Sequence, residues 1–357
     1  MLFEEKTLNN IMIDLKDTVE GDTNTEEGTL VDHSFRGAAA EFEQAYIVLG
    51  LIDQNGYAVT ADREHLLLRA KERGMEPLPA SNAVWKARFN QNVKTGTRFS
   101  AGALTYICTE QMEEKVCRVM CEQAGSKGNQ SQGTLMPIKY IEGLEDGELL
   151  ELLKPARDVE KTEDFRKRYL ANVAAPQACS GNREQYKQTL LEIEGVGACK
   201  IYRVTETEQR IRIYFLNNLY QIPSGELVED VQEIIDPKEK QGEGEGKAPI
   251  FHTVDICPCI QETIDIETDI TIDTGYTWEN LLPEIEGKID GYYLELAKGW
   301  EKEEHITVRI LRINAAIASV EGIVDVQNTF LNGKAENVLL DPNAIPARGG
   351  IRCRQQS

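Results

Sequence analysis

Residues 30–53 repeat apolar side chains at steps of three and four positions, which is the spacing of one face of an α-helix. The face combines alanines with larger apolar residues: Phe35, Ala38, Ala39, Phe42, Ala45, Tyr46 and Leu49. Small alanine side chains allow helices to approach one another closely. The sequence therefore predicts a long helix that packs either against partner helices or against the chain's own core.

The segments on both sides of this helix differ from it in composition. Residues 1–28 hold eight acidic residues against two lysines, together with a run of Asn, Thr and Gly, and this is typical of a mobile or partner-ordered lead-in. Residues 60–75 predict a second helix, in which Thr60 and Glu64 share a capping role and Gly74 supplies the left-handed stop.

Beyond residue 80 the pattern changes to short runs rich in β-branched and aromatic residues, which predicts a small β-domain. Farther on, a step from a helix through Glu-Gly into a strand occurs twice, at 194–196 and 321–323. We therefore expect an α+β multidomain protein with an N-terminal helical arm, a small β-domain and tandem mixed α/β units. The expected parts are residues 1–80 (bundle-forming arm), 81–175 (β-rich domain with a connecting helix), 176–275 (first α/β domain) and 276–357 (second α/β domain and C-terminal tail).

Charge and hydropathy narrow the range of partners. Asp and Glu outnumber Lys and Arg by 60 to 39, and the net charge of −21 makes the average surface repel phosphate backbones and anionic lipids. The first residues lack the basic region and apolar core of a signal peptide, and no run approaches the roughly 20 apolar residues of a membrane span. We expect no nucleic acid partner, no membrane insertion, and a protein that stays in the cytoplasm unless it is assembled into a particle that leaves.

The densest acidic group is Asp265, Glu267, Asp269 and Asp273, which alternates with isoleucines. Alternation along a strand places the carboxylates on one face, where a row of them can bind calcium or flank a scissile bond. A solvated outer face of a sheet explains the same pattern without any chemistry. A metal-dependent hydrolase that uses Asp265, Glu267 and Asp269 is the alternative function.

Other candidate sites are less complete. His252, Cys257 and Cys259 include the donor types of a zinc site, but structural zinc needs four ligands and no second cysteine pair lies nearby, so buried thiols explain them. The glycine-rich segment 242–247 reads as a flexible loop whose carboxylates would repel a phosphate. Since no nucleophile, P-loop or dinucleotide motif is present, we expect no enzyme and no catalytic, cofactor-binding or metal-binding residues.

The order of these features resembles the baseplate J family, the wedge proteins of contractile phage tails and R-type bacteriocins. The alanine-rich helix AAAEFEQAY and the segment LLLRAKERGMEPLPAS are similar to the family's N-terminal pattern, and KTGTRFSAGALTYICT is similar to its G-T-x-F strand. The helix KTEDFRKRYLANV resembles the family's charged helix, with Phe165, Arg166 and Arg168 as its core. The two Glu-Gly turns, with Asp325 and Val326 after the second, match its tandem α/β part.

The resemblance implies a structural, non-enzymatic subunit of a six-fold baseplate. In that family, N-terminal helices join two copies of this protein and one second wedge protein into a heterotrimer, and C-terminal domains of neighbouring wedges close an iris-like ring. The implied partners also include the central hub or spike, the tube and the sheath-initiating proteins, and the ring relays the contraction trigger to the sheath. The interface residues expected on this basis are Phe35, Ala38, Ala39, Phe42, Tyr46, Leu49, Ile323 and Val326.

The kind of particle stays open at this point. A phage tail, a bacteriocin and another contractile injection or secretion device all fit the resemblance. In each case the expected location is the bacterial host cytoplasm during assembly and then the baseplate of the released virion or particle.

Overall fold

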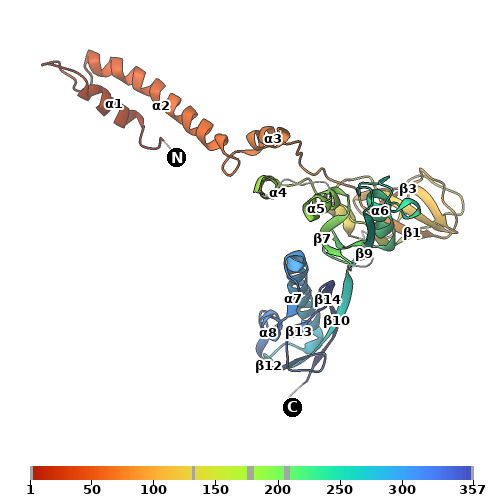
Figure 1. The fold of residues 1–357 in the computed structure, drawn as a ribbon. Coiled ribbons are helices and arrows are strands. Elements are labelled where there is room, and N and C mark those ends of the chain that lie inside the picture. The colour runs from red at the N-terminus through yellow and green to blue at the C-terminus, as the bar shows by residue number, and fades with distance from the viewer. Residues whose placement is uncertain (1–2, 131–132, 175–180, 205–209, 355–357) are drawn as a thin grey trace. The chain divides into compact units, whose positions relative to one another are not determined.

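The computed structural model describes residues 3–130, 133–174, 181–204 and 210–354. The chain divides into two compact units (Figure 1). Residues 1–78 and 160–176 form the first, here called the arm unit, and residues 79–159 and 177–357 form the second, the body unit. The α+β multidomain fold is confirmed, whereas the boundary expected at 175/176 lies outside the described residues.

The arm unit begins with two helices packed against each other, α1 (Leu8–Asp17) and α2 (Leu30–Gly56). Thr7 and Thr29 cap their N-termini, since each hydroxyl accepts a hydrogen bond from the backbone N–H three residues later. The expectation of a mobile or partner-ordered lead-in is wrong for residues 8–17. There an apolar stripe packs on α2 within the same chain, formed by Leu8, Ile11, Met12 and Leu15.

The base of the arm unit is a small core between α3 (Arg63–Lys71) and α4 (Thr162–Ala174). Phe165 of α4 is completely buried in it beside Leu66 of α3. The capping role expected of Thr60 is wrong, because the Thr60 hydroxyl donates to the carbonyl of Gln54 and the Asp62 carboxylate caps α3 instead. Gly74 adopts a φ of 67°, as expected for a left-handed helix stop.

Two arginines of α4 hold this base together. Arg166 donates to the carbonyl of Ala61 at 2.7 Å. Arg168 donates twice to the Glu160 carboxylate at 2.8 Å, and the same carboxylate accepts from the backbone N–H of Leu78 at 2.9 Å. The arginines expected from the family pattern therefore have a structural role, because they tie α4 to the chain that enters and leaves the body unit.

Residues 79–159 of the body unit form an antiparallel sheet with the strand order β5-β2-β3-β4-β1-β6. The elements are β1 (Val84–Phe89), β2 (Arg98–Ala101), β3 (Leu104–Glu113), β4 (Val116–Cys121), the short helix η1 (Ser126–Asn129), β5 (Met136–Pro137) and β6 (Gly147–Lys154). The two ends of this segment lie together, because the N–H of Ser81 donates to the carbonyl of Arg157 at 3.0 Å and the N–H of Arg157 donates back to the Ser81 hydroxyl.

The central part of the body unit pairs β8 antiparallel to β7 and parallel to β9. Its elements are α5 (Arg183–Glu192), β7 (Val196–Arg203), β8 (Arg210–Asn217), α6 (Gly225–Ile235), η2 (Lys238–Lys240) and β9 (Thr253–Pro258). Side chains at the C-terminal end of α6 close the outer edge of β9. Gln232 accepts from the Ile256 N–H and donates to the Val254 carbonyl, while Asp236 accepts from the Val254 N–H. The edge is therefore blocked against further strand pairing.

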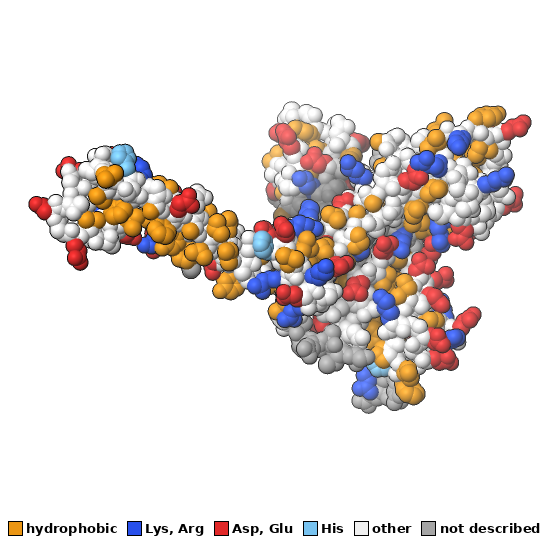
Figure 2. Space-filling model, turned by 90° about the horizontal axis from the view of Figure 1, so that it is seen from above, with side chains coloured by type: hydrophobic (Ala, Val, Ile, Leu, Met, Phe, Trp, Pro, Cys, Tyr) orange, Lys and Arg blue, Asp and Glu red, His pale blue; other side chains and the backbone are white. Residues whose placement is uncertain are grey.

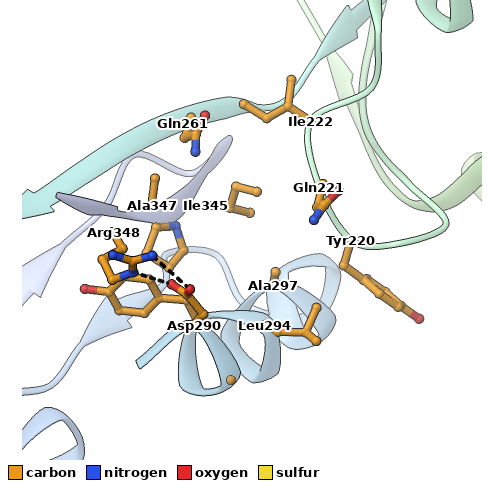
Figure 3. A pocket seen from close by; sticks show the side chains of 13 residues that line it. Tyr220, Gln221, Ile222, Gln261, Asp290, Leu294, Ala297, Ile345, Ala347 and Arg348 are labelled. Carbon is orange, nitrogen blue, oxygen red and sulfur yellow. Dashed lines mark hydrogen bonds and ion pairs between the residues drawn. The ribbon is translucent and has the colours of Figure 1, made fainter. Parts of the chain in front are cut away.

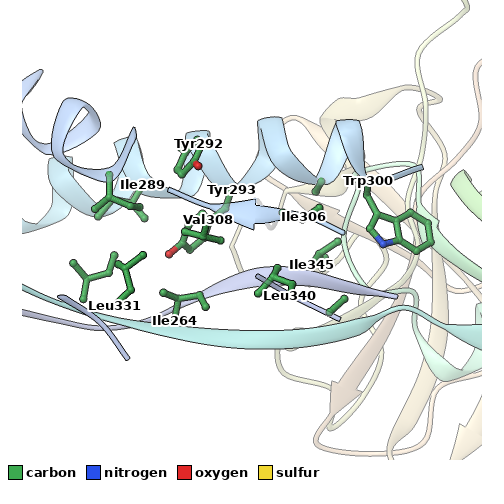
Figure 4. Close-up of a cluster of buried hydrophobic side chains, with 14 of the residues drawn as sticks. Ile264, Ile289, Tyr292, Tyr293, Trp300, Ile306, Val308, Leu331, Leu340 and Ile345 are labelled. Carbon is green, nitrogen blue, oxygen red and sulfur yellow. The ribbon is translucent and has the colours of Figure 1, made fainter. Parts of the chain in front are cut away.

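The last part places β10 between β12, which is antiparallel to it, and β14, which is parallel. Its elements are β10 (Ile260–Ile272), α7 (Trp278–Gly299), η3 (Trp300–Lys302), β11 (Thr307–Val308), α8 (Ile310–Ala318), β12 (Ile323–Leu331), β13 (Val338–Leu339) and β14 (Ala344–Cys353). Helix α7 lies over the sheet, and Ile289 and Tyr293 face Ile264 and Leu331 across the core (Figure 4). Because β10 belongs to this sheet, we propose that the two α/β domains divide near Cys259.

The two α/β domains share an apolar junction. Ala198 of β7 and Leu216 of β8 belong to the same buried cluster as Trp300. Lys200 is buried there: its Nζ donates to the Pro342 carbonyl at 2.6 Å and lies 4.7 Å from the centre of the Trp300 ring. Burial lowers the pKa of Lys200 below its ordinary value, and nearby ionisable groups, Cys259 first among them, oppose this shift.

The repeated Glu-Gly step is confirmed as a structural repeat. Gly195 leads into β7 with a φ of 90°, and Gly322 leads into β12 with a φ of 94°. A Cβ atom at Gly322 would lie 2.6 Å from the ring of Tyr276, so a side chain would clash there in addition to straining the backbone. In each of the two α/β domains, a glycine turn therefore connects a helix to the sheet strand that follows it.

Candidate assembly interface

Helix α2 holds the most exposed apolar surface of the arm unit. Apolar residues continue along it beyond the reach of α1, and Figure 2 shows hydrophobic side chains gathered over this helix. No helix in the described ranges is both long enough and apolar enough to cross a membrane. Exposed apolar residues gathered on one helix are typical of an interaction surface.

Helix α1 covers the first half of α2. Ile11 and Met12 enclose Ala39, and the backbone N–H of Leu8 donates to the Glu43 carboxylate at 2.8 Å. At the other end, Lys16 forms a 2.6 Å ion pair with Asp32. The hydrogen bond from Lys16 is the main reason that the pKa of Asp32 falls to about 2, helped by the backbone N–H of Gly28 and by Arg36. These contacts fix the position of α1 along α2.

The second half of α2 contains an exposed apolar segment at residues 47–52. Apart from Gly50, each residue of this segment is large and exposes about half or more of its surface: Ile47, Val48, Leu49, Leu51 and Ile52. At about 100° per residue, these five side chains span an arc of roughly 200° around the helix, about twice the width of an ordinary apolar stripe. An apolar arc of this width is more than one neighbouring helix covers.

The interface residues expected on α2 fall into two groups. Ala39 is buried by α1, with Phe35 and Tyr46 half-buried beside it. Ala38, Phe42 and Leu49 are exposed and line the open side of the helix. The sequence reasoning missed the exposed residues at 47, 48, 51 and 52, although the uninterrupted run IVLGLI at 47–52 was a visible signal that one apolar face was too narrow a description.

The residues expected to form the second interface lie on β12. Ile323 and Val326 are half-buried and pack against the core of their own domain. Val324, between them, exposes 65% of its surface and lies at an irregularity in the pairing of β12 with β10. The open apolar side chain of this strand is therefore Val324, which the sequence reasoning did not select.

The carboxylate row of β10 faces outward, as the alternation predicted, with Ile264, Ile266 and Ile270 buried behind it. Each carboxylate has a partner of its own: Glu267 pairs with Arg354 at 3.0 Å, Asp265 accepts from the Gly350 N–H, and Asp269 accepts from the Asn328 amide. Within the described ranges, no three His, Cys, Asp or Glu side chains are grouped so that they could hold a metal ion. The row has the contacts of a solvated sheet face.

Two of the three candidate zinc ligands form hydrogen bonds to other groups. His252 Nδ1 lies 2.8 Å from the Tyr186 hydroxyl, and the Cys259 thiol donates to the Asn343 carbonyl at 2.7 Å. Burial raises the pKa of Cys259 to about 12 and also raises that of Cys257. A protonated, enclosed thiol packs as a small apolar side chain.

A hollow of about 680 Å³ lies beside the junction of the two α/β domains. Figure 3 shows the loop that carries Tyr220, Gln221 and Ile222 facing α7 and β14 across it. Leu294, Ala297 and Ile345 contribute apolar walls. Arg348 closes one end, where it pairs with Asp290 at 2.8 Å and with Glu286 at 2.7 Å. The hollow thus combines an apolar floor with a charged rim.

Comparisons with known proteins agree with the resemblance seen in the sequence. Residues 178–258 match the Baseplate J-like central domain, and residues 264–353 match the Baseplate J-like protein C-terminal domain. Over 360 residues and the full length of both chains, the protein is 28% identical to the phage-like element PBSX protein XkdT of Bacillus subtilis (strain 168). It is also 28% identical, with the same coverage, to the uncharacterized protein YqbT of that organism.

Among solved structures, the chain is similar to one in the six-fold symmetrised cryo-EM structure of the anti-feeding prophage baseplate. That similarity covers 96% of this chain and 97% of the other, at 10% identity and a TM-score of 0.37. The family expected from the sequence is confirmed by the two domain matches.

Proposed function

Because the central and C-terminal domains of the baseplate J family make up residues 178–258 and 264–353 of this chain, we propose that it is a wedge subunit in the baseplate of a contractile tail or injection particle. Its role in this proposal is structural and not enzymatic. The name of the PBSX relative, a phage-like element protein, supports a particle of phage-like origin. We propose that this particle is assembled in the bacterial cytoplasm and then released.

The exposed segment 47–52 of α2 carries this proposal. Its exposed apolar side chains span roughly 200° of the helix circumference, which is too wide for one partner helix to cover, so at least two partner helices are needed. We propose that a second copy of this chain and one copy of a second wedge protein supply these helices. The resulting heterotrimer buries Phe42, Leu49 and Ile52 at its centre.

The body unit is suited to the second part of the proposed role, which is the contact between neighbouring wedges. Its tandem α/β domains each have a buried core, and the shared cluster around Trp300 joins them. We propose that the C-terminal domains of neighbouring wedges pair through β12 and its surroundings, including Ile323, Val326 and the exposed Val324. Repetition of this contact closes a six-fold iris-like ring around the hub and tube, which relays the contraction trigger to the sheath.

The test is the mass in solution of this chain alone and of this chain co-expressed with the second wedge protein, measured by light scattering after size exclusion. We expect a two-to-one complex from co-expression. The double variant Leu49→Asp, Ile52→Asp should abolish it, because two carboxylates would be buried without partners. Leu311→Asp, at a residue of α8 that is 77% exposed, is the matched control and should leave the complex intact. A chain that stays monomeric when it is co-expressed with the second wedge protein would contradict the proposal.

A further inference from the structure

The loop between α6 and β9 presents two apolar side chains to solvent. Phe251 exposes 88% of its surface and Ile250 exposes 61%. Phe251 also has a φ of 67°, in the left-handed region that non-glycine residues rarely adopt. An exposed aromatic residue held in an unfavourable backbone conformation indicates a function that the fold of the single chain does not explain. Ile250 and Phe251 are called the knob below.

The loop holds the knob in place by contacts to buried groups. The Asp236 carboxylate, which is almost completely buried, accepts from the Gly242 N–H at 3.0 Å and from the Val254 N–H at 2.8 Å. The N–H of Phe251 donates to the Gly242 carbonyl at 2.8 Å. A Cβ atom at Gly244 would lie 2.6 Å from the Ile250 side chain, so glycine is required there. The sequence predicted a flexible loop, whereas these contacts pre-organise the knob for binding.

The hollow beside the domain junction has the shape and chemistry to receive such a knob. Its volume of about 680 Å³ lies within the usual range for pockets that enclose a ligand, and Leu294, Ala297 and Ile345 provide apolar contacts (Figure 3). Leu294 is itself 40% exposed, so its side chain is accessible from solvent.

The knob and the hollow lie at opposite ends of the central sheet. Strands β8 and β9 are parallel, with Arg210 opposite Thr253 at one end and Phe215 opposite Pro258 at the other. The knob lies one residue before Thr253, while the loop at 220–222 follows β8 beyond Phe215. Five residue steps of about 3.3 Å separate the two ends by roughly 17 Å, so the knob does not reach the hollow of its own chain.

We propose that the knob of one copy inserts into the hollow of a neighbouring copy. Two different surfaces meet in this contact, so it runs head to tail and generates a ring when the rotation closes. The inference rests on the proposed ring of wedges and deepens it, because it adds a contact between knob and hollow to the contact proposed through β12. A protein partner is favoured over an anionic membrane surface because the chain carries a net charge of −21.

The test uses the chain co-expressed with the second wedge protein and carrying the photo-crosslinking residue p-benzoylphenylalanine at position 251. We expect crosslinks to Leu294–Ala297 or Ile345–Arg348 of another copy, identified by mixing isotope-labelled and unlabelled chains. Phe251→Gly should weaken association between wedges by at least roughly tenfold, as for the loss of an aromatic hot spot. It should leave thermal stability equal or higher, because glycine accepts the φ of 67°.

Tyr140→Ser, at a residue that is 89% exposed on the β-domain, is the control and should change neither crosslinking nor association. This inference is overturned if residue 251 crosslinks within its own chain, to the second wedge protein or to lipid, or if it forms no crosslink. Provided that the preparation still contains the two-to-one complex, each of these outcomes leaves the proposed function standing. A chain that stays monomeric would overturn both.

Discussion

The arm unit and the body unit bury their apolar residues in different ways. In the body unit, Phe99, Phe215 and Trp300 are enclosed by side chains of the same chain. Among the described residues of the arm, α1 and α2 bury Ile11, Met12 and Ala39, while the apolar segment 47–52 stays open. The cores of the body are therefore complete within one chain, whereas the proposed function assigns the covering of α2 to partner helices.

The largest effect should come from the body. Trp300→Ala removes a completely buried indole that packs in the shared cluster and lies under Lys200, and we expect a loss of about 3–5 kcal/mol in the free energy of unfolding. Urea denaturation of the purified chain measures this loss. Trp278→Ala, at a half-buried position, is the control and should cost clearly less. A loss below about 1 kcal/mol for Trp300→Ala would mean that the junction is loosely packed.

A smaller and local effect should follow from Asp32→Asn in the arm. The pKa of Asp32 is lowered from 3.8 to about 2, so its ion pair with Lys16 stabilises the α1–α2 pair above about pH 4 and is lost as the pH falls through about 2. At pH 5 the variant should show faster hydrogen exchange at the amides of α1 and an unchanged melting temperature of the body. At pH 2 the variant and the original protein should show the same hydrogen exchange. Equal exchange at pH 5 as well would show that α1 packs on α2 without the Asp32–Lys16 ion pair.

The smallest effect is expected at the open end of α2. Leu51→Ala in the isolated chain should change the free energy of unfolding by no more than about 0.5 kcal/mol, because half of the leucine is already exposed and alanine favours helix. Urea denaturation under the conditions used for Trp300→Ala gives a direct comparison. A loss of several kcal/mol would place segment 47–52 inside a core of the free chain and remove the contrast between the units.

Local patterns in the sequence were enough to predict several elements of this fold. The three- and four-residue spacing predicted α2, the alternation of isoleucines and acids predicted the buried and exposed faces of β10, and Gly74 predicted the end of a helix. Each of these features depends on residues that are neighbours along the chain.

Contacts between distant residues could not be predicted in the same way. Nothing local in the acidic lead-in indicates that Ile11 and Met12 cover Ala39, and the sealing of β9 by Gln232 and Asp236 depends on the packing of α6. For the candidate interface, helical spacing selected Ala39, which α1 buries, along with Phe42 and Leu49, which stay open. Which side of α2 remains exposed is decided by α1 and not by the sequence of α2 itself.

The core at the base of the arm consists of residues that the ribosome synthesises at two different times. Leu66 and Ala70 are made before the β-domain, whereas Phe165 and Tyr169, which complete their core, are made after it. At about 5–20 residues per second, the intervening stretch takes a ribosome roughly 5–20 s to synthesise. During that interval α2 and α3 emerge without α4, and the β-domain, whose ends meet at Ser81 and Arg157, can close first and bring the two halves of the arm's base together.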